Sequence, residues 1–253
     1  MSSSRNALLP LSWFVLTCCV TLAAAGQLDH SVRVRVTDEA RPLASALRQV
    51  EEQLGVVATY EDTCYLDPSE ITDKTRELSR TSVPERRILV MRGGSFSFEQ
   101  RDSSKATPAA VFEALLQKWA RDGYRSKFDV QKAEGGYHIV PTAAIDELGS
   151  IAPCVSPLDA VVSLEPKEES PQETLFRLVD AVSRASGRRV GVSVRGVPKT
   201  RSVTLFGGAT SEVARDVLWQ VLRDLGDSYS WQLLCSVGRD RECGLNIHRV
   251  VSR

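Results

Sequence analysis

Cysteine is the residue type with the clearest chemistry in this sequence. Four cysteines follow residue 25, an even number: Cys64, Cys154, Cys235 and Cys243. Cys235 and Cys243 flank the polar segment SVGRDRE between two apolar runs, so they could face each other across a hairpin. Cys64 and Cys154 would then remain as the other pair, and the four cysteines allow three pairings in all. Free buried thiols are the alternative, and the CxxC spacing typical of zinc sites does not occur.

Histidine and acidic residues do not form a recognisable catalytic pattern. The three histidines, His30, His138 and His248, are scattered along the chain. The acidic pairs Asp38–Glu39 and Glu61–Asp62 lie at the ends of predicted elements, where solvated charge is common. No serine, histidine and acid spacing nominates a catalytic triad. We therefore predict no catalytic residues, no metal, no cofactor and no enzymatic activity.

Two glycine pairs, Gly93–Gly94 and Gly207–Gly208, each follow a predicted strand. A glycine pair before a helix can hold an anion on exposed backbone amides. Each pair would also form a strand-to-helix turn that needs a permissive backbone, with Thr210 as an ordinary helix cap. Because the pair recurs with similar elements around it, we interpret it as part of the scaffold.

A basic run and one tryptophan are the candidate partner-binding residues. The run holds six basic side chains within 18 residues and no acidic one: Arg184, Arg188, Arg189, Arg195, Lys199 and Arg201. They could meet an acidic partner surface, or form a solvated helix end that the helix dipole stabilises. Trp219 is predicted at the edge of an apolar helical face and partly exposed, which suits an interface. Packing between two parts of the chain, or under a hairpin, is the alternative for Trp219.

The elements that must position these residues occur in two similar sets. In the first set, alternating valines predict a strand, and apolar residues at spacings of three and four predict a helix that ends at Gly55. Thr107 and Pro108 resemble the cap and first turn of a second helix. The predicted unit covers 30–142 with an insertion at 61–85. Its order is strand, helix, strand, strand, helix and hairpin, at 32–37, 42–54, 56–60, 87–91, 108–123 and 124–140.

The second set repeats this order over 159–253, after a linker at 143–158. Ser170, Pro171 and Glu173 form a capping-box signature at its first helix. Its elements are expected at 161–164, 170–187, 190–194, 202–206, 210–226 and 229–250. The fold class is therefore predicted to be α+β, with two tandem β-α-β-β-α-β-β units. Each unit would pack two helices on small mixed sheets.

The amino terminus has the pattern of a secretory signal at residues 1–25. One arginine precedes an apolar run that ends in small residues, with cleavage expected near Ala25. An uncleaved membrane anchor is the alternative. The chain has 32 basic and 32 acidic residues, so net charge does not favour nucleic-acid binding. We expect no membrane span in the mature chain and a periplasmic or secreted location.

The segment PLASALRQVEEQLGV, followed by a strand and then by a strand with a glycine pair, resembles a known domain family. The family is the short amino-terminal periplasmic domain of secretins and TonB-dependent signal transducers. The resemblance rests on Pro42, Leu43, Ala46, Leu47 and Gly55, and it covers both units. It implies a domain that binds other envelope proteins. The insertion at 61–85 departs from the family, and no secretin ring or barrel follows the second unit, so we expect no transport by this chain.

The favoured function is a non-catalytic periplasmic protein-interaction module. Its partner would be an envelope protein of the secretin-like, TonB-linked or regulatory kind. The alternative is a protein that binds a small ligand or a cell-wall glycan in a cleft between the two units. Whether the units pack together remains open at this point.

Overall fold

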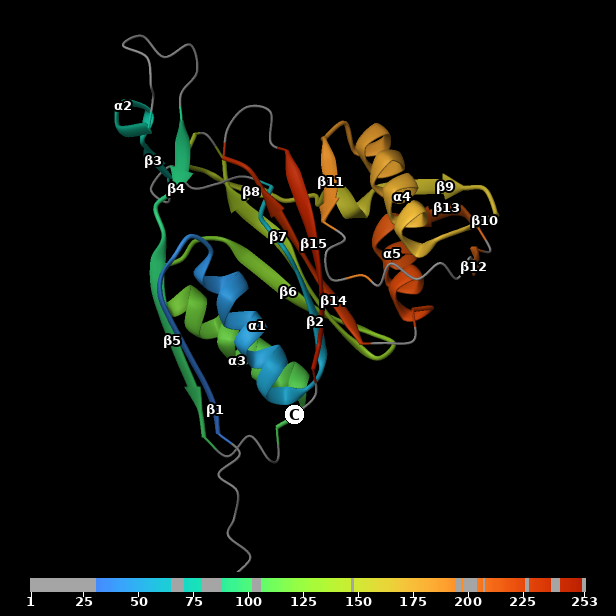
Figure 1. The fold of residues 1–253 in the computed structure, drawn as a ribbon. Coiled ribbons are helices and arrows are strands. Elements are labelled where there is room, and N and C mark those ends of the chain that lie inside the picture. The colour runs from blue at the N-terminus through green and yellow to red at the C-terminus, as the bar shows by residue number, and fades with distance from the viewer. Residues whose placement is uncertain are drawn as a thin grey trace, which may run out of the picture.

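The computed structural model describes residues 31–64, 71–78, 88–101, 106–146, 148–193, 197, 204–206, 208–225, 228–237 and 242–251. The predicted signal at residues 1–25 lies outside these ranges, as does His30. The described parts combine helices and strands, so the α+β class is confirmed (Figure 1). No helix among the described residues is long and apolar enough to cross a membrane.

The first unit begins with a strand and an amphipathic helix. The apolar face of this helix, α1, buries Leu43, Leu47 and Val50. Pro42 occupies its first turn, and Gly55 ends it in the left-handed conformation, as predicted. The elements of this unit and of the linker are β1 (Val32–Glu39), α1 (Pro42–Leu54), β2 (Val57–Glu61), β3 (Ile71–Asp73), α2 (Thr75–Leu78), β4 (Leu89–Met91), β5 (Gly94–Gln100), α3 (Pro108–Arg121), β6 (Lys127–Ala133), β7 (Gly136–Ile145), β8 (Ile151–Pro153) and the 3-10 helix η3 (Pro157–Asp159).

The second unit repeats the order of the main elements. Its first helix, α4, begins with the predicted capping box between Ser170 and Glu173 and ends at Gly187 in the left-handed conformation. The elements are β9 (Val161–Leu164), β10 (Lys167–Glu169), α4 (Pro171–Ser186), β11 (Val190–Ser193), β12 (Thr204–Phe206), β13 (Ala209–Val213), α5 (Ala214–Arg223), β14 (Tyr229–Cys235) and β15 (Cys243–Arg249).

The strand pairings of one unit recur in the other. β1 pairs with β5, and β9 pairs with β13, in antiparallel two-stranded sheets. β2 runs parallel to β7, which forms a hairpin with β6, and β11 runs parallel to β15, which forms a hairpin with β14. This repeated topology supports the interpretation of the sequence as a tandem duplication.

The two units share one central sheet instead of having separate small sheets. Its main strand order is β11-β15-β14-β2-β7-β6, and β8 also pairs with β7. The units meet where β14 runs parallel to β2, with Gln232 opposite Tyr60 and Leu233 opposite Glu61. The segment expected to be a linker, 143–158, also contains regular structure, because β8 and the start of η3 lie in it.

Helices cover opposite faces of this sheet. In Figure 1, α1 and α3 lie between the central sheet and the β1–β5 sheet, whereas α4 and α5 lie on the other side of the central sheet. Strand β2 is buried along its whole length because it is covered on both faces. Ala58 and Tyr60 belong to the core of the first unit, and Val57 belongs to the core of the second. The two units therefore pack together through a continuous layer.

The prediction that each glycine pair leads directly into a helix is wrong. Gly93 lies between β4 and β5, Gly94 is the first residue of β5, and β5 comes before α3. In the second unit, β13 follows Gly208 and comes before α5. Thr210 lies in β13, and α5 begins after Val213 without a side-chain cap. The described glycines, Gly93, Gly94 and Gly208, are therefore followed by strands, and none of them is at a helix amino terminus.

Candidate functional site

The cysteines form the two pairs that hairpin spacing favoured. Cys235 and Cys243 are joined across the β14–β15 hairpin, where they are opposite residues of the ladder. Cys64 and Cys154 form the second disulfide, 90 residues apart, and it ties the end of the β2 segment to the linker. Both disulfides lie close to the place where the units join.

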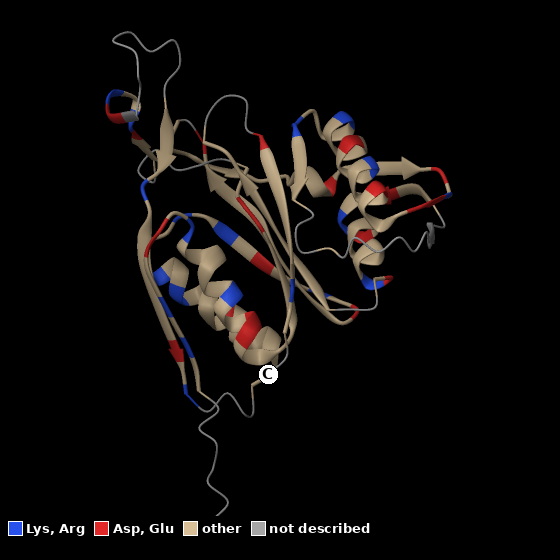
Figure 2. Cartoon of the chain, in the orientation of Figure 1, with Lys and Arg blue, Asp and Glu red and all other residues tan. Residues whose placement is uncertain are grey.

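The basic run is partly neutralised by its own neighbours. Arg184 pairs with Asp180 on the surface of α4, and Arg189 pairs with Glu242 at 2.9 Å. Figure 2 shows basic and acidic positions alternating along α4. Arg188 lies between α4 and β11 and is partly exposed. Three further residues of the run, Arg195, Lys199 and Arg201, lie outside the described residues.

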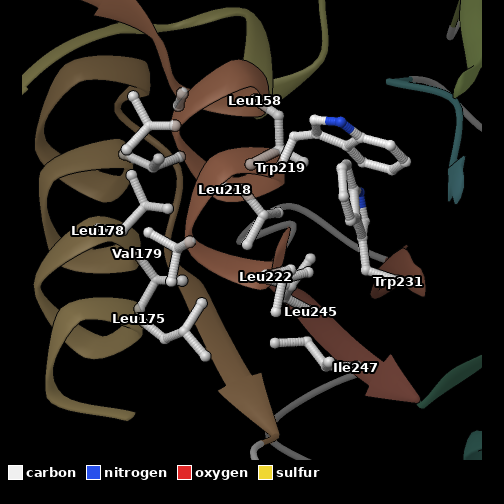
Figure 3. Close-up of a cluster of buried hydrophobic side chains, with 14 of the residues drawn as sticks. Leu158, Leu175, Leu178, Val179, Leu218, Trp219, Leu222, Trp231, Leu245 and Ile247 are labelled. Carbon is white, nitrogen blue, oxygen red and sulfur yellow. The ribbon is translucent and has the colours of Figure 1, made fainter. Parts of the chain in front are cut away.

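Trp219 is not a surface residue, contrary to the expected partial exposure. Its side chain is 9% exposed, and its ring Nε1 donates a hydrogen bond to the backbone oxygen of Glu134 at 3.1 Å. Its ring packs edge-on against Trp231, which is fully buried (Figure 3). Trp219 therefore packs between the units, the alternative interpretation for this residue. The hairpin of the first unit covers it, and helical periodicity alone does not reveal that contact.

A buried ion pair lies at the same junction. Arg215 of α5 binds Glu61 of β2 through two contacts of 2.6 and 2.9 Å, and it also binds Asp159 at 2.8 Å. Ser156 donates a hydrogen bond to Glu61. Burial alone would lower the pKa of Arg215, but the bonds to Glu61 and Asp159 raise it above its ordinary value. Arg215 is therefore charged and holds β2 against α5.

The expectation that Glu61 and Asp62 are solvated is wrong, because both side chains are buried. Asp62 accepts hydrogen bonds from Arg41 at 2.7 Å, from Tyr60 at 2.9 Å and from the backbone nitrogen of Cys235 at 2.8 Å. Arg41 also donates to the backbone oxygen of Cys235 at 2.6 Å. Glu61 joins the first unit to α5 of the second, and Asp62 joins it to the disulfide-bonded hairpin.

His138 is a buried neutral histidine at the junction. Its Nδ1 lies 2.7 Å from the hydroxyl of Thr59, and its ring packs edge-on against Trp219. Burial, with a smaller contribution from the charge of Arg215, lowers the pKa of His138 to about 4. At neutral pH the ring is uncharged, which suits its contacts with the two tryptophans.

The cleft expected between the units is largely filled by these side chains. What lies at its rim is an open groove of about 550 Å³ between the β6–β7 hairpin and α5, lined in part by Lys132, Glu134, Arg215 and Arg223. Arg215 is bonded to Glu61, and Arg223 is bonded to Glu134 at 3.1 Å. Arg215, Arg223 and Glu134, three charged residues of this groove, are therefore engaged within the chain.

A second groove of about 550 Å³ runs between β6 and α3, at the outer edge of the central sheet. Its lining is part apolar and part polar. The apolar residues are Leu116, Trp119, Ala120, Phe128 and Val130, and the polar ones are Glu113, Gln117, Ser126, Lys127, Asp129, Gln131 and Thr142. Leu116, Phe128 and Val130 are only partly buried against the core of the first unit. In the described part of the chain, β7 is the sole strand paired with β6, so β6 is an edge strand, and its residues 127–131 line the groove. We take this β6–α3 groove as the candidate functional site.

The sequence prediction named no residue of the β6–α3 groove. Phe128 and Val130 alternate with Lys127, Asp129 and Gln131, which is the pattern of a strand with one polar face. This pattern predicts a strand, but it does not predict whether the strand lies at the edge of a sheet. In the described parts of the chain, no group of three His, Cys, Asp or Glu side chains is placed to hold a metal ion.

Comparisons with known proteins assign no family to the chain. No family model matches it, and no similar curated protein was found. No solved structure matches the fold.

Proposed function

We propose that this chain is a non-catalytic protein-interaction module that works outside the cytoplasm and docks to an envelope protein through the β6–α3 groove. The observation that carries the proposal is the partly apolar groove beside β6, one of the two edge strands of the central sheet in the described part of the chain. A sheet edge offers backbone donors and acceptors, and an adjacent apolar groove offers specificity. Together they suit a polypeptide better than a compact small molecule.

The location outside the cytoplasm rests on two features of the chain. The first is the signal-like pattern at residues 1–25. The second is the pair of disulfides, Cys64–Cys154 and Cys235–Cys243, because disulfides persist in oxidising compartments. A periplasmic or secreted module fits both features.

The buried ionisable groups support a structural role over a catalytic one. Arg215 and Glu61 bind each other, and Asp62 is satisfied by Arg41, Tyr60 and Cys235. Their interactions cross-link the two units and restrict the relative motion of the parts that carry the groove. A binding module benefits from such rigidity, because less conformational freedom is lost on association.

Site-specific photocrosslinking in the native cells tests the proposed function. A photoreactive amino acid would replace Ala120, which is exposed and lines the β6–α3 groove. The matched control is Ala110, an exposed alanine on the same helix that does not line the groove. A third position, Arg189, samples the basic surface.

We expect position 120 to give an adduct with an envelope protein that position 110 does not give. An adduct from position 189 instead would move the docking surface to the basic run. If none of the three positions gives an adduct, the interaction module is wrong. A panel of envelope metabolites that raises the melting temperature would then favour the small-ligand alternative.

A further inference from the structure

The second unit contains a filled counterpart of the β6–α3 groove. Strand β2 of the first unit runs beside β14 and beneath α5, where its Glu61 binds Arg215 and its Val57 joins the core around Trp219. Two hydrogen bonds hold β2 there. The backbone nitrogen of Asp62 donates to the backbone oxygen of Leu233 at 2.8 Å, and the hydroxyl of Ser230 donates to the backbone oxygen of Ala58 at 3.0 Å. The chain thus already shows how a strand is added to one of its own sheet edges.

The repeated topology relates the two grooves residue by residue. β6 and β14 are the first strands of equivalent hairpins, and α3 and α5 are the helices before them. Leu116 lies seven residues before Gly123, and Trp219 lies seven residues before Gly226. Ala120 and Arg223 each lie three residues before the same glycines. Leu116 therefore corresponds to Trp219, and Ala120 corresponds to Arg223. The first of each pair lines the β6–α3 groove, and the second lies over strand β2 at the junction of the units.

We propose that the β6–α3 groove is a strand-addition site, in which an extended segment of a partner protein pairs in parallel with β6. This inference rests on the proposed function and specifies its mode of binding. The added strand would turn alternate side chains toward α3, as Val57 and Glu61 of β2 turn toward α5. Its remaining side chains would face away from α3.

The lining of the groove predicts the chemistry of this segment. Leu116 and Ala120 are smaller than Trp219 and Arg223, so a bulky apolar side chain fits where β2 carries Val57. Counting from the same glycines, Phe112 occupies the place of Arg215 and is fully buried. The guanidinium that binds Glu61 in the second unit therefore has no counterpart on α3. The segment should carry apolar residues at the two positions that correspond to Val57 and Glu61 of β2.

A foreign segment fits this edge better than a second copy of the chain. The strand equivalent to β2 that a second copy could offer is β11, which follows Arg188 and Arg189. On β6 it would approach the exposed side chains of Lys127, Asp129 and Lys132, whose summed charge is positive. The ion pair Glu61–Arg215, which holds β2 in place, also has no counterpart in that pairing.

Synthetic peptides test the mode of binding on the full chain. The parent peptide has the sequence of residues 56–62, VVATYED, and the test peptide carries Val57→Phe and Glu61→Leu. We expect the test peptide to bind about tenfold or more tightly than the parent and than a scrambled control. Amide hydrogen exchange within residues 127–133 should slow when it binds, because the outer edge of β6 becomes hydrogen-bonded.

Two alanine substitutions on α3 provide matched variants. Ala120→Arg places a long side chain in the groove, and Ala110→Arg places the same side chain elsewhere on the exposed face of the helix. Because both sites are exposed, thermal melts should show that both variants fold. Ala120→Arg should weaken binding of the test peptide by about tenfold or more, and Ala110→Arg should leave it unchanged.

Three results would overturn the inference. One is binding of the test peptide without slower exchange in β6. Another is no binding of the test peptide while photocrosslinking at position 120 still captures a partner, which would leave the proposed function intact. The third is self-association of the chain that Ala120→Arg abolishes, which would make a second copy the occupant.

Discussion

At the scale of single residues, the Glu61–Arg215 ion pair is the most demanding contact of the junction. Arg215→Ala would leave the Glu61 carboxylate buried without its cation. We expect this variant to lose about 3–5 kcal/mol of the free energy of unfolding, measured by urea denaturation. The double variant Glu61→Met with Arg215→Met should recover most of the loss, because it leaves no buried charge unpaired.

The exposed pair Arg184–Asp180 is the control for this experiment, because solvent screens it. Arg184→Ala should not measurably change the urea midpoint. A loss for Arg184→Ala as large as that for Arg215→Ala would contradict the importance assigned to burial.

His138 makes stability depend on pH. Its pKa of about 4 in the folded chain lies below the value of 6.5 expected when it is unfolded, so the unfolded chain binds more protons between these values. Stability is therefore full above pH 6.5 and falls as pH drops toward 4, by roughly 3 kcal/mol from this residue.

The variant His138→Gln tests this contribution, because glutamine does not titrate. Urea denaturation at several pH values should give a shallower fall for His138→Gln than for the unsubstituted chain over the same range. Equal slopes for the two proteins would show that His138 does not carry the dependence. A lower stability of the variant at all pH values is expected from lost packing and does not affect the comparison.

At the scale of elements, Gly136 at the start of β7 allows α5 to approach the first unit. A Cβ atom at this position would lie 2.6 Å from the ring of Trp219 and 2.7 Å from the backbone oxygen of Val57. Gly136→Ala should therefore destabilise the chain by about 1–3 kcal/mol, measured by thermal melting. The matched control is Gly191→Ala in β11, where nothing lies within 4 Å, and it should be nearly neutral. Equal effects of the two substitutions would argue against close packing at Gly136.

Local sequence signals predicted most of the elements but not their partners. The capping box at Ser170 and the helix-ending glycines Gly55 and Gly187 act within a few residues, so their patterns are readable. Strand β5 was missed although Phe96 and Phe98 alternate with polar residues, because the glycine pair before it was assigned to a helix turn. Strand β13, ATSEV, has no such alternation and could not be recognised in this way.

The site was less predictable than the fold. The local sequence predicts that Glu61 is a solvated residue at a strand end. Its burial depends on Arg215 of α5, which lies 154 residues later in the chain. Trp219 reads as partly exposed until the β6–β7 hairpin covers it. Contacts between units decide both cases, and neither periodicity nor capping carries information about them.

At the scale of the whole molecule, the shared sheet predicts that the two units unfold together. Each unit covers part of the other: α5 packs on β2, and α1 accepts a hydrogen bond from Gln232 of β14 at 3.0 Å. Calorimetry should show a single transition, with calorimetric and van't Hoff enthalpies that agree. The fragment 159–253, which lacks β2, should melt at a lower temperature than the full chain. Two separate transitions in the full chain would mean that the junction does not couple the units.

The parallel pairing of β14 with β2 also sets an order of events during synthesis. Ser230 donates a hydrogen bond to Ala58, which is synthesised 172 residues earlier. The backbone groups at this edge of β2 therefore stay unpaired until the carboxyl-terminal hairpin is present. During that interval an unpaired strand is exposed to aggregation. Glu61 and Asp62 lie at the end of this strand, so their contacts with Arg215 and with the Cys235 backbone form only once the carboxyl-terminal unit is present.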